Sequence, residues 1–412
     1  MLSWRNPIPR LRMLRRPPPT SVAAGASVIL FFCIVSYTSP YYTESHPDEP
    51  WSRPSYHGHS SAFSFDAGWA YEAWPPDRPY LDPQHRESWM ARIPDSTPLT
   101  DVNIPGTHDT MTYAFEDADE VLQCQTSNVS TQLAAGVRYL DIRARLQDDS
   151  LRIYHADGPT GFDLTDVLMP VFDFLDRNPS EVVVMRLKEE GPPVGDGSTM
   201  SFEQTFNHYR LTYPVTADGA DRHLALHDGS GPVPTLGELR SKIFLIQNFA
   251  SDPALPGYGL LWEGDQMVLE DVWVVEHPEQ LMTLKWPAIR DALEVAAAAP
   301  DDDSRLYLTH VSASVGVLPI EAAAGPILVP DPADRVEGGE PEDRVDRREP
   351  EDGVVPVVGM NDMTGRWLQN YMRRRYVSSF HPPPRVGVVI FDFPGRRLVD
   401  AVLDMNAPLA VQ

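Results

Sequence analysis

The sequence predicts an α/β fold, a distorted TIM-like (β/α)8 barrel, preceded by a transmembrane segment. Two observations indicate the barrel. Short, apolar, β-branched runs recur from Trp89 onward, and helical or loop segments separate them. A chain of 412 residues is long enough for one such barrel with additions. The membrane segment is indicated by residues 17–43, which carry no charge and follow an arginine-rich stretch.

Eight runs are expected to form the strands of the barrel. They are Leu99–Pro105, Gly136–Leu146, Leu151–His155, Glu181–Leu187, Lys242–Phe249, Met267–Val275, Arg305–Ser312 and Val386–Phe393. Their spacing favours a parallel barrel over a sandwich, since amphipathic stretches lie between several of them.

Two helices between the strands can be predicted from apolar periodicity. The first follows Thr165 and ends at Asn178-Pro179, and the second covers about Glu279 to Ala297. The positions expected to face inward are Leu168, Val171, Phe174 and Leu175 in the first helix, and Leu281, Leu284, Ile289 and Leu293 in the second.

The N-terminal part is expected to tether the protein to a membrane. Residues 1–19 form a basic cytosolic tail, 20–42 a signal anchor and 43–88 a Pro-, Ser- and aromatic-rich stalk or wrap. At about 1.5 Å per residue, 20–42 is long enough to cross a hydrocarbon core of about 30 Å. The arginines then predict a single-pass protein of the secretory pathway or cell surface, with its folded part lumenal or extracellular. A cleaved signal peptide, giving a secreted protein, is the alternative.

The remaining part, 89–405, is expected to be the barrel, with one insertion at 330–353. The insertion is charged and rich in Pro and Gly, and it has too few apolar residues to join a core. It is therefore predicted to be disordered, with an acidic calcium site as the alternative. A sequon at Asn128-Val129-Ser130 is consistent with a lumenal barrel and predicts glycosylation.

Charge and cysteine content exclude several classes of partner and site. The 34 Lys and Arg against 59 Asp and Glu give a formal charge of −25, which argues against nucleic acid and against general attraction to anionic lipid. An anionic substrate must therefore be held by local cations. Cys33 and Cys124 provide neither a disulfide framework nor a zinc spacing, so Cys124 is expected to be a buried free thiol.

Uncommon polar residues cluster at the ends of the predicted strands, which meet at one face of a TIM barrel. They are His108, Asp109, Asp141, Arg143, His155, Lys188, Asp271 and Asp392. Each has an ordinary structural alternative: a satisfied histidine, a buried ion pair or a loop-entry carboxylate. Two histidines, two orienting carboxylates and one guanidinium together, however, provide the groups needed for general acid–base phosphoryl transfer.

Four stretches carry a resemblance to a known family. They are WMARIPDSTPLTDVNIPGTHDT, GVRYLDIRARL, LRIYHADGP and NPSEVVVMRLKEE. Together they resemble the X domain of bacterial-type phosphatidylinositol-specific phospholipases C and their fungal relatives. The similarity covers roughly 89–398 and weakens after Glu190. It implies a distorted TIM barrel, a phospholipid substrate at a membrane surface, and a cyclic inositol phosphate as first product.

The resemblance also implies a role for each motif residue. His108 would be the general base oriented by Asp392, and His155, assisted by Asp109, the general acid. Arg143 would neutralise the phosphate where calcium-dependent relatives bind calcium, so no metal and no cofactor are expected.

The sequence departs from the family pattern in two places. The family's His-Gly is His155-Ala156-Asp157-Gly158 here, after a one-residue deletion in the preceding turn. Among the inositol-binding positions Lys188 and Asp271 match, Trp273 replaces the aromatic platform, and a family arginine appears as Asn248, which puts inositol specificity in doubt.

Three functions remain open from the sequence. The first is cleavage of phosphatidylinositol or of a glycosylphosphatidylinositol anchor. The second is a metal-dependent glycerophosphodiesterase or phospholipase D on a similar barrel, and the third is a barrel that binds phosphoinositide or glycan without turnover. The sequence does not indicate an oligomeric state.

Overall fold

The computed structural model describes residues 86–115, 120–330, 354–376 and 384–410. The predicted tail, signal anchor and stalk lie outside the described residues. Among the described helices none is both long and apolar enough to cross a membrane. Most of the predicted insertion, 331–353, also lies outside them. Pro330, predicted to belong to the insertion, instead ends a strand that pairs antiparallel with the strand on the other side of the insertion.

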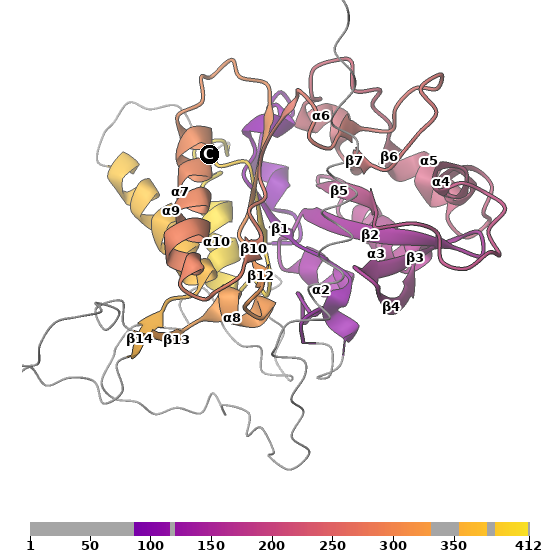
Figure 1. The fold of residues 1–412 in the computed structure, drawn as a ribbon. Helices are drawn as coiled ribbons and strands as arrows, with labels where there is room; N and C mark the ends of the chain where they lie inside the picture. The colour runs from indigo at the N-terminus through magenta and orange to yellow at the C-terminus, as the bar shows by residue number, and fades with distance from the viewer. Residues whose placement is uncertain (1–85, 116–119, 331–353, 377–383, 411–412) are drawn as a thin grey trace, which may run out of the picture. The chain divides into compact units, whose positions relative to one another are not determined.

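Parallel strands form the centre of the molecule (Figure 1). The strands are β1 Ile104–Thr107, β2 Tyr139–Gln147, β3 Ser150–His155, β4 Gly158–Asp163, β5 Val182–Glu189, β6 Leu224–Ala225, β7 Lys242–Asn248, β8 Leu260–Leu261, β9 Met267–Glu270, β10 Val274–Val275, β11 Leu306–His310, β12 Ser314–Val315, β13 Ile327–Pro330, β14 Val354–Val357 and β15 Val388–Phe391. In the main sheet the order is β6-β7-β5-β2-β1-β15-β11-β9, with each neighbouring pair parallel. The described strands show no pairing of β9 with β6 or β8, so the barrel is open there.

Helices cover the outside of this sheet. They are α2 Val129–Ala134, α3 Leu164–Arg177, α4 Phe202–Leu211, α5 Ala217–His223, α6 Leu236–Leu239, α7 Trp286–Ala297, α8 Pro319–Ala324, α9 Met360–Tyr376 and α10 Arg396–Asp404. Figure 1 shows α7, α9 and α10 grouped on one side and α3, α4 and α5 on the other. The helix predicted after Thr165 is confirmed as α3, which begins with a capping box at Asp163 and buries the expected stripe.

The second predicted helix is also present, with one position assigned wrongly. A single π turn, Leu281–Lys285, leads into α7. Leu281, Ile289 and Leu293 are buried as expected, whereas Leu284 is 42% exposed. The π turn rotates the chain relative to an α-helical register, because it inserts an extra residue into the turn.

Three predicted strands differ from the observed ones. Leu99–Asp101 forms a 3-10 turn, so the first strand begins only at Ile104. Met267–Val275 is divided between β9 and β10, and β10 pairs with β12 in a separate small sheet. Leu151–His155 is a strand, but as β3 it runs antiparallel to β2 and lies outside the parallel barrel. The hairpin is set by Asp148 and Asp149, both at positive φ, as a two-residue primed turn requires.

Apolar side chains from the two faces of the strands build separate cores. One face contacts the surrounding helices, and the other fills the lower part of the barrel with residues that include Ile104, Tyr139, Val184, Leu308 and Ile390. On four of these strands the next inward side chain, two residues later, is polar, because alternate residues share a face. On β1 the next inward position is Gly106, and the polar His108 follows it by two residues. The apolar layer is thus the floor on which the polar groups of the next layer lie.

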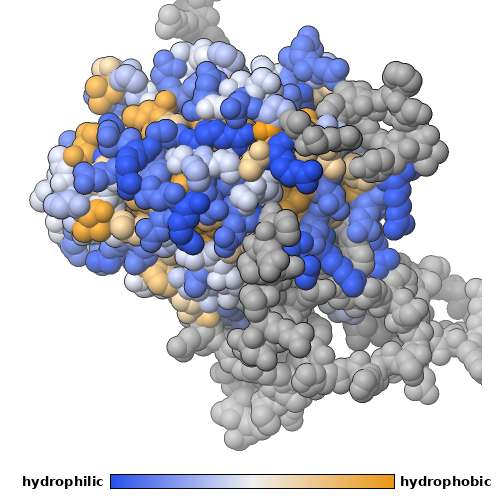
Figure 2. Space-filling model, turned by 180° about the vertical axis from the view of Figure 1, so that it is seen from behind, coloured by the Kyte–Doolittle hydropathy of each residue, from blue (hydrophilic) through white to orange (hydrophobic). Residues whose placement is uncertain are grey.

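The face of the molecule drawn in Figure 2 is mostly hydrophilic. On the face drawn in Figure 2, apolar side chains lie in small separate groups among hydrophilic ones.

Beneath the barrel a fully buried ion pair joins β2 to β5. Arg138 Nε donates to Glu181 Oε2 at 2.9 Å, and neither side chain is exposed to solvent. Arg138 also donates to the carbonyls of Leu133 and Val137. Since removing one partner leaves a buried charge uncompensated, this pair makes the barrel sensitive to single substitutions.

We therefore expect Glu181→Ala to lower the free energy of unfolding by about 3–5 kcal/mol, measured by urea denaturation. The control is Asp291→Ala, which breaks the Arg290–Asp291 pair, whose side chains are 44% and 62% exposed, and should cost at most about 1 kcal/mol. Equal effects of the two substitutions would contradict the structural role of the buried pair.

Candidate active site

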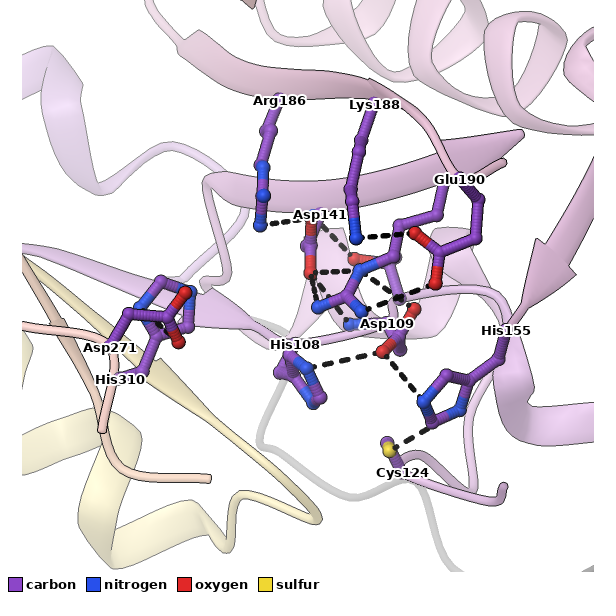
Figure 3. Close-up of polar contacts among 12 residues, drawn as sticks. His108, Asp109, Cys124, Asp141, His155, Arg186, Lys188, Glu190, Asp271 and His310 are labelled. Carbon is purple, nitrogen blue, oxygen red and sulfur yellow. Dashed lines mark hydrogen bonds and ion pairs between the residues drawn. The ribbon is translucent and has the colours of Figure 1, made fainter. Parts of the chain in front are cut away.

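Two histidines flank one carboxylate at the open end of the parallel strands (Figure 3). Asp109 Oδ2 lies 3.1 Å from His108 Nε2 and 3.3 Å from His155 Nε2. His108 and Asp109, the two residues that follow β1, both contribute to this cluster. His108 directly continues the strand, whereas Asp109 adopts a positive φ of 41°, which turns its carboxylate back toward the barrel axis.

The other ring nitrogen of each histidine is held by a fixed acceptor. His108 Nδ1 lies 2.8 Å from Asp392 Oδ1, and His155 Nδ1 lies 2.7 Å from the carbonyl of Leu122. If each Nδ1 donates its proton there, each Nε2 is left facing the shared carboxylate. Asp392 follows β15, which pairs with β1, so the carboxylate and His108 are brought together by strand neighbours.

Arg143 lies beside the two histidines and is held by three carboxylates. Its Nε and Nη2 both donate to Asp141 Oδ2, at 3.0 and 2.9 Å. Its Nε also lies 3.1 Å from Asp109 Oδ1, while its Nη1 has Glu190 Oε1 only at 3.6 Å. One end of the guanidinium is therefore fixed, and Nη1 is the nitrogen least engaged by the protein.

The strand register explains why these groups face one another. In the parallel pairing of β2 with β5, Asp141 lies opposite Arg186 and Arg143 opposite Lys188. The same register continues into β7, where Asn248 lies opposite Lys188. All five positions therefore project from the same face of the sheet. Asp141 and Arg186 form the first layer above the apolar floor, and Arg143, Lys188 and Asn248 form the second.

His155 lies at the site as predicted, in spite of the unusual sequence that follows it. Ala156 takes a positive φ in the turn between β3 and β4, and its backbone N–H donates to Glu190 Oε1 at 3.1 Å. Arg145 Nη1 donates to Asp157 Oδ1 at 2.7 Å. The two extra residues are thus anchored at the tip of the hairpin, and His155 remains at the site.

Burial and charge move the pKa values of these groups apart. Burial raises the pKa of Asp109 to about 6, against the opposing effect of Arg143. Burial, with the positive charge of Arg143, lowers the pKa of His108 well below its usual value. Although burial alone would raise it, Arg143 and Arg186 hold the pKa of Asp141 well below its usual value. His108 is therefore neutral and able to accept a proton at neutral pH.

The substrate-binding residues predicted from the sequence are more widely spread. Lys188 Nζ lies 2.5 Å from Glu190 Oε2 and shares the layer of Arg143. Asp271 follows β9 directly, rather than lying within the strand as predicted, and its Oδ1 is 3.8 Å from His310 Nδ1. Trp273 is 41% exposed on the rim. Asn248 accepts two hydrogen bonds from Arg186, at 3.0 and 2.6 Å.

Five residues of the site were not predicted as part of it: Arg186, Glu190, Trp262, His310 and Cys124, which the sequence predicted only as a buried thiol. Arg186 stacks over the Trp262 ring, 3.5 Å from its centroid, and donates from Nη1 to Asp141 Oδ1 at 3.3 Å. The His310 ring lies 6.2 Å from that of His108, and its buried Nε2 has no hydrogen-bond partner within the described residues. Alternation would have found three of them, because Arg186 and Glu190 each lie two positions from Lys188, and His310 follows the inward Leu308 by two.

A short segment before α2 connects the two histidines. Gln125 Nε2 donates to the carbonyls of His108 and Phe391, at 2.7 and 2.9 Å. Cys124, confirmed as a buried free thiol, places its Sγ 4.0 Å from His155 Nδ1. Its backbone carbonyl accepts from Phe393 N, next to Asp392. This segment therefore fixes the spacing between His155 and the pair of His108 and Asp392.

Comparison with known proteins agrees with this arrangement. Residues 96–248 match the family described as phosphatidylinositol-specific phospholipase C, X domain. A 1-phosphatidylinositol phosphodiesterase of Listeria monocytogenes is 31% identical over 253 residues, which cover 58% of this chain and 72% of the relative. The chain belongs to this phospholipase C family. The resemblance found in the sequence, and the enzyme class that it implies, are thereby confirmed.

Further similarities support the same family and fold. A 1-phosphatidylinositol phosphodiesterase of Staphylococcus aureus strain Newman is 29% identical over 203 residues, covering 48% of this chain and 62% of the relative. The solved phosphatidylinositol-specific phospholipase C of Listeria monocytogenes superposes with a TM-score of 0.57 at 25% identity, covering 78% of this chain and 99% of that one. The predicted TIM-like barrel is confirmed as a fold of this family.

The raised pKa of Asp109 predicts that this residue lowers the stability of the folded protein at neutral pH. Because the folded state holds this proton more tightly than the unfolded chain, the group's contribution is full below pH 3.8 and is lost as the pH rises through about 6. A rise from 3.8 to about 6 corresponds to about 3 kcal/mol at neutral pH. Asp109→Asn should therefore raise the melting temperature relative to wild type more at about pH 7.5 than at about pH 4.5.

The measurement is thermal unfolding of both proteins across this pH range, with the exposed Asp291→Asn as control. A difference between Asp109→Asn and wild type that does not change with pH would show that Asp109 is not buried as an acid of raised pKa.

Proposed function

We propose that the chain is a metal-independent phosphodiesterase that cleaves a phosphatidylinositol-type lipid into diacylglycerol and a cyclic inositol phosphate. The observation that carries the proposal is the shared Asp109 oxygen, which has a histidine Nε2 on either side and Arg143 next to it. A site that only bound phosphate would need the cation, but it would not need two oriented imidazoles as well.

The reaction is an in-line displacement at phosphorus. His108 Nε2 takes the proton of the inositol 2-hydroxyl, and that oxygen forms the new bond to phosphorus. The bond from phosphorus to the glycerol oxygen breaks, and His155, protonated at Nε2, gives its proton to the departing oxygen. Asp392 and the Leu122 carbonyl keep the rings in the required orientation, and Asp109 stabilises the charged form of His155.

Arg143 supplies the positive charge that the phosphate needs. Its Nη1 protons are the least engaged, and they would donate to the non-bridging oxygens as negative charge develops there. Asp141, whose pKa is held low by Arg143 and Arg186, fixes the other end of the guanidinium. A preorganised cation of this kind takes the place that a bound metal ion has in metal-dependent phosphodiesterases, which is why activity without metal is proposed.

The inositol ring would bind on the side of His108 away from His155. Asp271 and Arg186 supply charged groups there, with Trp262 and His310 as neighbouring rings, whereas Lys188 lies beside Glu190. Arg186 reaches the oxygen of Asn248, so a guanidinium is present at the position where the sequence suggested that a cation had been lost. This supports an inositol head group, and a glycosylphosphatidylinositol anchor is a second lipid of the same chemistry.

The substrate would be taken from a membrane surface. Val272, Trp273 and Val315 are 37%, 41% and 49% exposed on the segments that follow β9 and β11, next to the site. An exposed aromatic and aliphatic rim suits insertion among lipid head groups.

We further propose that residues 20–42 anchor the protein in a membrane of the secretory pathway or at the cell surface, with the barrel lumenal or extracellular.

His108→Asn and His155→Asn should each reduce kcat by about 10²–10⁴-fold, because each removes one proton-transfer group. The assay follows cyclic inositol phosphate released from phosphatidylinositol vesicles. The matched control is His208→Asn, at a half-buried position of α4 that takes no part in the site. Unchanged turnover in either active-site variant would refute the assignment of these residues.

Full activity is expected in excess EDTA, which separates this reaction from that of a metal-dependent glycerophosphodiesterase or phospholipase D. Loss of activity on chelation would exclude the proposed role of Arg143.

Arg186→Ala should raise KM for phosphatidylinositol about tenfold or more with a smaller change in kcat, since it removes a charged binding contact of about 1.5–3 kcal/mol.

A further inference from the structure

A lysine is buried on the side of the site where the inositol ring is proposed to bind. Lys285 ends the π turn Leu281–Lys285, and its side chain has no exposed surface, whereas the apolar Leu284 before it is 42% exposed. Fully buried lysines are rare unless they are paired, and π turns occur frequently at functional sites. The turn therefore places a charge inside and a leucine in solvent, the reverse of what folding stability alone would favour.

Lys285 binds the ends of two neighbouring strands. Its Nζ donates to the carbonyl of His310 at 2.6 Å and to Glu270 Oε1 and Oε2 at 3.2 and 3.4 Å. Glu270 is the last residue of β9 and His310 the last of β11, and these two strands pair in parallel. Among the described strands β9 pairs with β11 alone, so this is an edge at which the barrel is open. Lys285 thus fixes an edge that has a neighbouring strand on one side only.

The same contacts hold Asp271 from both sides. Glu270 Oε1 also accepts a hydrogen bond from the backbone N–H of Val272 at 3.0 Å. Asp271 is the single residue between these two, so both of its neighbours are bound through one carboxylate, which Lys285 holds. The Asp271 side chain is 33% exposed, with Oδ1 3.8 Å from His310 Nδ1. Its backbone is therefore fixed while its carboxylate stays open to a ligand.

The imidazole of His310 is oriented by the same strand end. Its Nδ1 lies 3.0 Å from the carbonyl of Glu270, and this hydrogen bond requires Nδ1 to carry the proton. Nε2 is then an acceptor, and it is buried with no hydrogen-bond partner among the described residues. Figure 3 shows His310 and Asp271 together, on the side of His108 away from His155. Two hydrogen-bond acceptors, the Asp271 carboxylate and His310 Nε2, are thereby prepared for hydroxyl groups.

Folding stability does not explain the pair of Lys285 and Glu270. A buried ion pair is often no better for stability than apolar residues of similar volume, because both charges lose their water. Burial lowers the pKa of Lys285 and raises the pKa of Glu270, so it disfavours the charged form of each. What the pair provides instead is a fixed position for the groups around it.

We propose that Lys285 is a positioning residue for the inositol ring. Paired with Glu270, it holds Asp271 and His310 so that their acceptors are in place for ring hydroxyls before the substrate arrives. Lys285 itself touches no substrate. This role rests on the proposed function, which names the inositol ring as the ligand. Loss of Lys285 should therefore weaken head-group binding and leave the acid, the base and Arg143 in place.

The test uses the purified full-length chain with the double substitution Glu270→Gln and Lys285→Met. It removes both charges with little change of shape, and a glutamine at 270 can still accept from the Val272 N–H, so the melting temperature should equal or exceed that of the wild type. KM for phosphatidylinositol vesicles and the inhibition constant of free myo-inositol should both rise about tenfold or more, with kcat changed by less than about threefold. A pair with only a structural role would instead lower the melting temperature and leave both constants unchanged.

Asp271→Asn tests whether Lys285 acts through this carboxylate. If it does, the double substitution raises the myo-inositol inhibition constant less in the Asp271→Asn background than in the wild type. The control is Lys242→Met, at the start of β7 and so at the end of the strand away from the site, which should leave both constants unchanged.

Three results would overturn the proposal: unchanged constants in the double variant, effects of the double substitution and of Asp271→Asn that simply add, or a ligand-free wild type whose Val272 amide exchanges hydrogen as fast as an unprotected amide. The last needs no variant, so a variant that fails to fold does not protect the proposal. If the wild type neither cleaves phosphatidylinositol nor binds myo-inositol, the proposed function fails, whereas exchange of the Val272 amide still reports whether Lys285 and Glu270 hold this edge.

Discussion

The register of the parallel strands is the constraint on which the site depends. Asp141 opposite Arg186, and Arg143 opposite Lys188, are consequences of how β2 pairs with β5. A shift of β5 by one residue would move Arg186 and Lys188 to the outer, helix-covered face, because alternate residues of a strand point to opposite faces. Apolar packing below the site prevents such a shift, since it would remove Val184 from the interior of the barrel in the same movement.

Burying so many charges is tolerated because they are paired in a chain. Arg186, Asp141, Arg143 and Asp109 are successive partners, and the chain ends at the two histidines. Each side chain offsets the free energy of desolvating its neighbour's charge, which would be too high for an unpaired buried charge. The charge of Asp109 is only partly compensated: its pKa is raised to about 6, and its Oδ2 lacks a good hydrogen-bond donor. Shifted pKa values of this kind are typical of functional sites.

The family's pattern is carried here by partly different residues, and local contacts compensate for the differences. The longer turn after His155 is tied down by Glu190 and Arg145. The guanidinium expected from β7, where Asn248 lies, comes instead from Arg186 on the neighbouring strand. Arg186 can reach Asn248 because two adjacent parallel strands can present side chains to the same point.

The sequence by itself determined the strand-rich barrel, the helix after Thr165, and the placement of both histidines, Arg143 and Asp392 at strand ends, where the structure brings them together. These follow from periodicity and from motifs, which depend only on residues close together in the chain. Tertiary structure alone decided that β3 turns back as a hairpin, that Leu284 faces solvent, and that Arg186, Glu190, Trp262, His310 and Cys124 join the site. The reason is physical: strand direction and the neighbours of a buried side chain are set by packing between segments far apart in sequence, and no local pattern records them.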